Sequence, residues 1–503
     1  MSADEDYSWA APVGTASAAD AVAVAPSPVA GATDPCFTEA RETLRLLAQR
    51  KLSARELMAA HLARIRAVNP KVNAIVGKLA DDECLELAAA SDELRARGAR
   101  LGALAGLPWA FKDVEEAVGL ACTFGSPIFR DYRAGADTVL VERLRSAGVL
   151  PIGKTNVPEF GMGSHTYNRV YGPTRNPYDL TKSAGGSSGG AAVAVATGML
   201  ALADGSDFGG SLRNPGNFNN IVGFRPSVGL VPLAPSSMPF FGFVVKGPLA
   251  RTVSDAALLL AVLAGEDPRD PGCYPSQPAR FGEPLARDVR GVRIAWSPDL
   301  GCLPLAAAVR QVIDAQRTVL EDLGCVVEEA SPDLSDADEI FLTLRRWRSW
   351  TELGPWLETH RADLKPEAAE EIEAGSRVTS AMLATAFKAH AALLERMRRF
   401  NERYEFLASA VNQVVPFDVG LDWPTSVGGV PMDHYIAWMK SAYWITTTWA
   451  PAISVPAGFT PGGLPVGMQI TGRWRDDRRV LEMAYAFEQA TGVGRRRPAL
   501  GPG

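Results

Sequence analysis

The chain has 503 residues and carries 51 Lys and Arg against 57 Asp and Glu, a formal net charge of −6. Hydrophobic residues make up 47% and charged residues 21%, which excludes a disordered or fibrous protein. The acidic balance offers no general attraction for nucleic acid or for an anionic membrane. The six cysteines stand singly, without CxxC pairs, and no apolar stretch reaches the roughly 18 residues of a membrane span. We therefore expect reduced thiols, no nucleic acid or membrane partner, and a cytoplasmic location.

The first part of the chain divides into an extension and a pair of helices. Residues 1–35 are rich in Ala, Ser, Pro and Val and show no periodicity, which predicts a loose N-terminal extension. From Phe37 to Val68 apolar residues recur at helical spacing, and Ser53 with Glu56 forms a capping box. Two amphipathic helices are expected to open the ordered domain.

The middle of the chain alternates short apolar runs with helical patterns and many glycines, as in a layered α/β fold. The small, apolar residues 191–203 predict a buried helix whose N-terminus points at Ser187 and Ser188. Residues 266–284 are typical of a surface connection. The expected strands are residues 108–111, 149–152, 200–203, 292–296 and 325–328, with a helix over residues 306–323.

A tryptophan-rich section follows, because seven of the eleven tryptophans fall within residues 342–449. Long helical patterns, such as residues 379–408, run through it. We favour helix packing as the role of these rings, since aromatic stripes at helical spacing usually fill cores. The alternative is an aromatic-walled pocket for an apolar substrate.

Two glycine-serine segments, residues 182–191 and 205–215, carry the strongest chemical signal. Glycine allows close approach and positive φ, so a serine flanked by glycines can sit in an exposed turn where neighbouring N–H groups converge. That arrangement suits an oxyanion hole. Neither segment has the Gly-Lys-Ser/Thr ending of a phosphate-binding loop or the G-x-G-x-x-G pattern of a dinucleotide site. A flexible loop would explain one such segment but hardly two so close together.

A nucleophilic serine needs a base, and the residues alone leave two candidates. His165 is the only histidine near the glycine segments, and geometry decides whether it reaches them. Lys112 ends an apolar, strand-like run and would serve if burial lowered its pKa. By default, a lone lysine after a strand is a solvated surface charge.

Several motifs together resemble the amidase signature family. They are Lys112 in Phe-Lys-Asp, residues 185–190 (Gly-Gly-Ser-Ser-Gly-Gly), residues 209–213 (Gly-Gly-Ser-Leu-Arg) and residues 223–226 (Gly-Phe-Arg-Pro). The similarity extends from about residue 37 to residue 489. It implies an α/β/α sandwich with a large mixed central sheet. It also implies a single amidase domain over residues 36–503, in which residues from about 342 to 449 form a helical insertion that caps the site.

The resemblance also implies roles for particular residues. Ser211 would be the nucleophile, Ser187 the bridging residue on a cis peptide, and Lys112 the base. The remaining implied roles are an oxyanion hole made by the backbone N–H groups of Phe208, Gly209, Gly210 and Ser211, and support by Ser188, Asp207 and Arg213. Such a Ser-cisSer-Lys triad implies an acyl-enzyme and needs neither metal nor cofactor.

Two departures from the commoner family pattern bear on the substrate. Phe208 stands where threonine is frequent, and residues 217–220 (Asn-Phe-Asn-Asn) replace a Phe-Cys-Gly run. With Phe240, Phe241 and Phe243, the first change favours an apolar or aryl substrate. The leading hypothesis is therefore a hydrolase of small carboxamides, with esters and carbamates open to the same chemistry.

Two alternatives stay open. One is the catalytic subunit of a glutamine-dependent tRNA amidotransferase, and the other is an inactive binding protein on the same fold. For the leading hypothesis the expected partner is a small-molecule amide, and a homodimer is the assembly to test.

Overall fold

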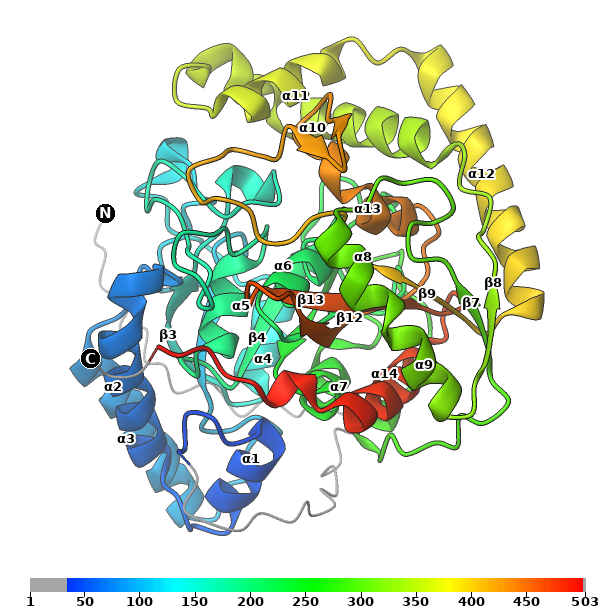
Figure 1. The fold of residues 1–503 in the computed structure, drawn as a ribbon. Helices are drawn as coiled ribbons and strands as arrows, with labels where there is room; N and C mark the ends of the chain where they lie inside the picture. Colours follow the sequence, from blue (N-terminus) through cyan, green and yellow to red (C-terminus); the bar gives the residue numbers. More distant parts are fainter. Residues whose placement is uncertain (1–33, 501–503) are drawn as a thin grey trace.

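The computed structural model describes residues 34–500 of the chain. The predicted N-terminal extension therefore lies outside the described residues, apart from its last two positions. Figure 1 shows β12 and β13 in the middle of the molecule, α1, α2 and α3 at one end, and α10, α11 and α12 at the other.

A large sheet of eight strands forms the centre, in the order β4-β6-β5-β12-β13-β9-β7-β8. The strand β7 runs parallel to β8 and β9, and the other neighbouring pairs are antiparallel. The predicted large mixed sheet is thus confirmed. Its strands are β4 (Leu202–Asp207), β5 (Val222–Arg225), β6 (Val245–Ala250), β7 (Arg293–Trp296), β8 (Val326–Glu329), β9 (Phe406–Ala410), β12 (Ala452–Phe459) and β13 (Pro465–Thr471).

A smaller sheet of three strands, in the order β1-β3-β2, lies beside the large one. The side chain of Asp204 in β4 joins the two sheets, because Trp109 Nε1 donates to Asp204 Oδ1 at 2.9 Å and the Lys112 N–H donates to Asp204 Oδ2 at 3.1 Å. The strands outside the large sheet are β1 (Ile75–Val76), β2 (Pro108–Lys112), β3 (Leu150–Thr155) and the hairpin β10 (Ser426–Val427) and β11 (Val430–Pro431).

Helices surround the sheets, and α5 and α7 are almost wholly buried because their residues are apolar on every side. The α-helices are α1 (Ala40–Ala48), α2 (Ala54–Val72), α3 (Asp81–Ala96), α4 (Val139–Ser146), α5 (Gly189–Ala196), α6 (Arg213–Phe218), α7 (Val253–Leu263), α8 (Ala307–Asp314), α9 (Gln316–Asp322), α10 (Ala337–His360), α11 (Pro366–Ser376), α12 (Ser380–Arg403), α13 (Lys440–Thr446) and α14 (Asp477–Thr491). Short 3₁₀ turns are η1 (Pro127–Phe129), η2 (Glu159–Gly161), η3 (Pro278–Gly282), η4 (Ala437–Met439) and η5 (Val493–Arg495).

Local signals fix several element starts. The predicted capping box of α2 is confirmed, with Ser53 Oγ accepting the Glu56 N–H at 3.1 Å and Glu56 Oε2 accepting the Ser53 N–H at 2.9 Å. The six cysteines are free thiols, four of them buried. Within the described residues, no helix is both long and apolar enough to cross a membrane.

Three predicted helices were wrong in extent. The helix expected over residues 191–203 is α5, which ends at Ala196, because Gly198 turns the chain with a φ of 74° and β4 begins at Leu202. The helix expected to reach residue 408 is α12, which ends at Arg403, since β9 follows and pairs with β13 and β7. The helix expected over residues 306–323 divides into α8 and α9. Tertiary pairing overrides local helix propensity in β9.

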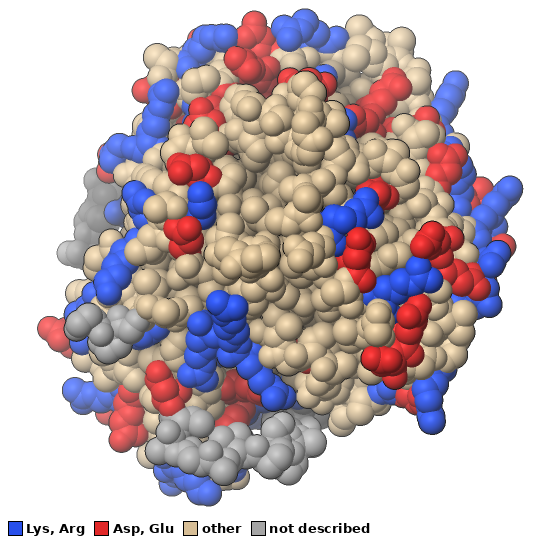
Figure 2. Space-filling view, in the orientation of Figure 1, with Lys and Arg blue, Asp and Glu red and all other residues tan. Residues whose placement is uncertain are grey.

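The surface carries both signs of charge. On the face shown in Figure 2, Lys and Arg alternate with Asp and Glu around the rim, while the centre is largely uncharged. One group of positive side chains stands out low in that view.

Candidate active site

Lys112 ends β2 in the seam between the two sheets, and its side chain is fully buried. Its Nζ lies 2.8 Å from Ser187 Oγ, 2.9 Å from Ser188 Oγ and 2.9 Å from Ser206 Oγ. The default interpretation of Lys112 as a solvated surface charge is therefore wrong. Its three partners come from two parts of the chain, the turn before α5 and the strand β4.

Sequence reasoning missed Ser206. The signal that could have found it is strand alternation, because Ser206 lies two residues after Asp204 in β4, and alternate residues of a strand face the same side. Asp204 contacts β2, so Ser206 is directed toward β2 as well.

The environment of Lys112 favours the neutral amine. Burial lowers its pKa to about 7, against the opposing influence of the nearby carboxylates of Glu115, Asp204 and Asp207. Burial also raises the pKa of Asp204 to about 6. A substantial fraction of Lys112 is thus uncharged at pH 7 and available to accept a proton.

The turn before α5 depends on its glycines. The peptide bond between Gly186 and Ser187 is cis, as the family resemblance implies. A Cβ on Gly190 would lie 2.3 Å from the backbone nitrogen of Asn156, so α5 packs against the end of β3 more closely than any side chain allows. Ser187 and Ser188 directly precede this closely packed helix, which begins at Gly189.

Ser211 lies in the loop between β4 and α6, and only 7% of its surface is exposed. Its carbonyl oxygen accepts the N–H of Ser188 at 3.2 Å, which ties the two glycine-serine segments together. The N–H of Gly210 donates to Asp207 Oδ1 at 2.9 Å. Among residues 34–500, the N–H groups of Gly209 and Ser211 find no acceptor. The N–H of Phe208 has no acceptor within these residues either, so three of the four predicted oxyanion donors are free.

Asp207 anchors this loop through buried charges. Arg213 binds it with two hydrogen bonds, Nε to Oδ2 at 3.0 Å and Nη2 to Oδ1 at 2.9 Å, while Arg225 Nη1 lies 3.1 Å from Oδ1. The three side chains have no exposed surface. Burial alone would raise the pKa of Asp207, but the two guanidinium groups outweigh it and hold the pKa below its ordinary value. Asp207 is thus a permanent anion that positions the Ser211 loop.

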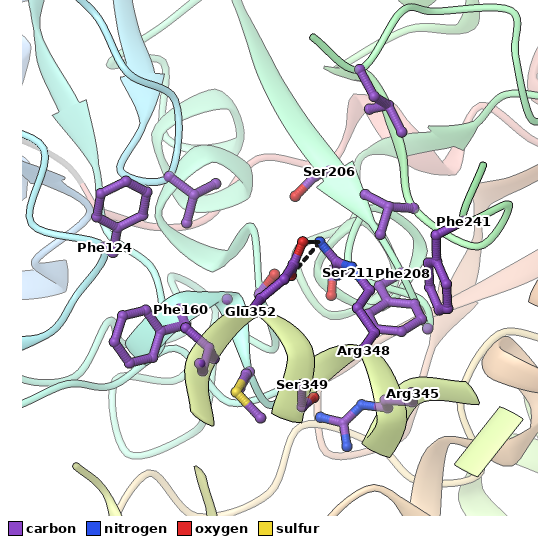
Figure 3. Close-up of a pocket in the computed structure, with 18 of the residues that line it drawn as sticks. Phe124, Phe160, Ser206, Phe208, Ser211, Phe241, Arg345, Arg348, Ser349 and Glu352 are labelled. Atoms are coloured by element: carbon purple, nitrogen blue, oxygen red, sulfur yellow. Dashed lines mark hydrogen bonds and ion pairs between the residues drawn. The ribbon is translucent and has the colours of Figure 1, made fainter. Parts of the chain in front are cut away.

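A cavity of about 590 Å³ opens above the serines, and six phenylalanine rings are among the residues that line it. Figure 3 shows Phe124 and Phe160 on one side of the view and Phe208 and Phe241 on the other. The residues that line the cavity and bear on its chemistry are Ser187, Ser206, Ser211, Phe124, Phe160, Phe208, Phe241, Phe341, Arg348, Ser349 and Glu352.

The two interpretations of the tryptophan-rich section can now be separated. Trp438 and Trp444 lie in a buried cluster, and none of the seven tryptophans of that section lines the cavity. The packing interpretation is therefore confirmed for these two rings, and the aromatic wall of the cavity is built from phenylalanines instead. Of the three phenylalanines near residue 240, only Phe241 lines the cavity, because Phe240 is 80% exposed and Phe243 is buried in the core.

His165 does not join the serines of the cavity. Its Nδ1 lies 2.8 Å from Ser183 Oγ and its Nε2 lies 3.0 Å from the Val419 carbonyl oxygen. Burial lowers its pKa to about 4. His165 thus reaches the first glycine-serine segment only at Ser183, whereas Lys112 contacts Ser187 and Ser188. Across residues 34–500, no group of three or more His, Cys, Asp or Glu side chains could hold a metal ion.

This mixed α/β fold matches solved structures of amide-hydrolysing enzymes. Residues 56–481 match the family described as Amidase, so the chain belongs to the amidase family, as its motifs predicted. The protein is an enzyme that hydrolyses amides.

Three similarities illustrate this membership. An acylamidase of Rhodococcus erythropolis is 35% identical over 92% of this chain and 97% of its own length. A glutamyl-tRNA(Gln) amidotransferase subunit of Moorella thermoacetica is 34% identical over 92% of this chain and 99% of its own length. The crystal structure of a bacterial aryl acylamidase of the amidase signature family matches with a TM-score of 0.86 and 30% identity, over 92% of this chain and 99% of that one. Sequence identity alone thus does not separate a hydrolase from an amidotransferase component.

Proposed function

We propose that the protein hydrolyses the C–N bond of small apolar or aryl carboxamides, with Ser211 as nucleophile, Ser187 as proton bridge and Lys112 as base. One observation carries this proposal: the buried Lys112 Nζ lies 2.8 Å from Ser187 Oγ, in surroundings that lower its pKa to about 7. A nearly neutral amine beside a hydroxyl is what a lysine base for serine requires.

The hydrogen bonds around Lys112 support this direction of proton transfer. A neutral amine has two N–H groups and one lone pair. Ser188 Oγ is placed to donate its own proton to the Ser206 carbonyl oxygen, at 3.4 Å, so it accepts from Lys112 rather than donating to it. When the second N–H of Lys112 goes to Ser206 Oγ, the lone pair is left for the hydroxyl of Ser187.

The reaction then runs in two balanced halves. Lys112 accepts the Ser187 proton, Ser187 takes the Ser211 proton, and Ser211 Oγ forms a bond to the substrate carbonyl carbon. The N–H groups of Gly209 and Ser211 stabilise the oxyanion, with the amide of Phe208 as a further donor. The C–N bond breaks, the departing amine takes a proton back through Ser187, and an acyl-enzyme ester remains. Water repeats the attack, releases the acid and restores Ser211.

The cavity favours the binding of an apolar acyl or aryl group, because phenylalanine rings face the cavity from two sides. The names acylamidase and aryl acylamidase, carried by two of the similar proteins, point the same way. Esters and carbamates pass through the same tetrahedral chemistry, so we include them among the substrates to screen.

Labelling and substitution test the triad. A fluorophosphonate probe is expected to modify Ser211 in the folded protein, and Lys112→Ala is expected to abolish hydrolysis of 4-nitroacetanilide. Circular dichroism of the variant checks that it folds. An unlabelled Ser211 would instead support the inactive binding protein, and an unchanged rate in a folded Lys112 variant would reject the base assignment.

The catalytic subunit of a glutamine-dependent tRNA amidotransferase is the second candidate, supported by 34% identity to the Moorella thermoacetica protein. Phe208 counts against it, since the ring occupies the cavity beside the oxyanion loop. Glutaminase activity, together with co-purification of partner proteins and tRNA, would favour this candidate over the hydrolase.

Light scattering of the purified protein tests whether it forms a homodimer.

A further inference from the structure

The helix α10 contributes an arginine and a glutamate, Arg348 and Glu352, to the cavity that also contains Ser211. They stand one helical turn apart and form an ion pair, with Arg348 Nη2 2.8 Å from Glu352 Oε2. Figure 3 shows this pair between the two groups of phenylalanine rings, close to Ser211 in the view. Glu115, Glu116, Lys246 and Arg345 also line the cavity.

Arg348 is held in a defined place. Its guanidinium carbon lies 5.3 Å from the ring centroid of Phe208 and 5.4 Å from that of Phe241, so two ring faces flank the cation. Its side chain is 25% exposed, which leaves it open to the cavity. A guanidinium that is already oriented loses little conformational freedom when it binds a ligand.

The two partners of the pair are unequally satisfied. Both oxygens of Glu352 are engaged, since Oε1 accepts from Ser237 Oγ at 2.8 Å and from Arg348 Nη2 at 3.1 Å, and Oε2 pairs with the same Nη2. Arginine has five N–H donors, and only those of Nη2 are used here. Within residues 34–500, no acceptor contacts Nε or Nη1 of Arg348. Arg348, and not Glu352, therefore has hydrogen-bonding groups left for a ligand.

The other two cations that line the cavity are less open to a ligand, with side chains 12% exposed for Lys246 and 6% exposed for Arg345. Lys246 Nζ lies 2.6 Å from Glu115 Oε2. Arg345 is buried between Glu371 and the Tyr435 hydroxyl. Arg348 is thus the cavity cation best placed to receive an anion.

We propose that Arg348 binds a carboxylate of the substrate, so that the preferred amides carry an anionic group in addition to their apolar or aryl part. This inference rests on the proposed hydrolase function. The free N–H groups of Nη1 can donate to a carboxylate oxygen beside the Glu352 pair, and the low exposure of the site strengthens such a charge-assisted hydrogen bond. Arg348 is a binding residue in this proposal and takes no part in proton transfer.

Two matched pairs of chromogenic amides test the proposal, one for each side of the scissile bond. Glutaryl-4-nitroanilide is compared with hexanoyl-4-nitroanilide, and 5-acetamido-2-nitrobenzoate with 4-nitroacetanilide. The measured quantity is the ratio of kcat/KM for the anionic member to that for the neutral member. In Arg348→Met this ratio is expected to fall by roughly tenfold or more in at least one pair, mainly through KM.

A purely structural role would move both members of a pair equally, so an unchanged ratio in both pairs overturns the proposal. Arg399→Met is the matched control, because Arg399 is an exposed arginine on α12 that pairs with Glu395. Its ratio is expected to equal that of the unmodified protein.

A second variant keeps the proposal falsifiable if Arg348→Met does not fold. Glu352→Gln removes the negative charge that competes with a substrate carboxylate, so the ratio is expected to rise several-fold in at least one of the two pairs. A ratio that stays the same or falls contradicts the proposal. Failure of the proposed function is distinct: the unmodified protein would then cleave neither member of either pair, and the inference would fall with it.

Discussion

Two regions of the site are built in different ways: the floor, made of Lys112 and the serines beneath the cavity, and the wall, made of Arg348, Ser349 and Glu352 on α10. On the floor, Lys112, Ser187 and Ser188 stand at the ends of a strand and a helix, and their side chains have almost no exposed surface. On the wall, Arg348 and Glu352 project from a helix surface, and each side chain is about a quarter exposed. Ser187 of the first region and Arg348 and Glu352 of the second line the same cavity.

This difference separates the residues expected to carry out the reaction from those expected to select the substrate. On the floor the positions of the polar atoms are set by backbone packing, as at Gly190, so one substitution disturbs several contacts. The wall uses side chains on a helix that can change without moving the sheets. We expect floor substitutions to remove activity or stability, and wall substitutions to redistribute activity among substrates.

The largest expected effect compares two serines of the same cavity. Ser211→Ala removes the nucleophile and is expected to lower kcat for 4-nitroacetanilide by roughly 10⁴-fold or more. Ser349→Ala, on the wall, is expected to change kcat/KM by less than about tenfold. Steady-state kinetics on both variants check the contrast, and comparable losses would break it.

Stability should show the same contrast between buried and half-exposed ion pairs. Asp207→Asn leaves two buried arginines without their anion and is expected to lower the free energy of unfolding by about 3–5 kcal/mol. Glu352→Gln breaks a partly exposed pair and is expected to cost about 1 kcal/mol or less. Denaturant unfolding of both variants measures the difference, which a similar loss in the two would contradict.

The pH dependence of activity tests the floor alone. Lys112 acts as a base only when neutral, and its pKa is lowered to about 7, so kcat/KM for a neutral anilide should rise about tenfold per pH unit below 7. Above that pH the profile should level off. A flat profile between pH 5 and 9 would argue against Lys112 as the base.

The smallest expected effect concerns the ring that joins the two regions. Phe208 precedes the oxyanion loop and packs against Phe241 and Phe341, with ring centroids 5.5 and 5.4 Å apart. Phe208→Thr should lower the preference for an aromatic amide over acetamide by about tenfold, through lost apolar contact. The ratio of the two kcat/KM values measures this. An unchanged preference would show that the ring does not contact the substrate.

Much of the fold was predictable because its signals are short in range. The capping box at Ser53 and the strands around residues 108, 150 and 293 depend on residues a few positions apart. The large mixed sheet and the amidase family followed from the glycine-serine motifs and their companions. The division into one domain with a capping insertion over residues 342–449 stays a prediction.

The family, the two glycine-serine turns and the residue types available for catalysis follow from the amino-acid sequence alone. Tertiary structure decided that Lys112 is buried, that Ser206 joins it and that phenylalanines rather than tryptophans wall the cavity. The reason is distance along the chain. Lys112 meets Ser187 and Ser206 across 75 and 94 residues, and its pKa depends on burial that exists only once both sheets have packed together.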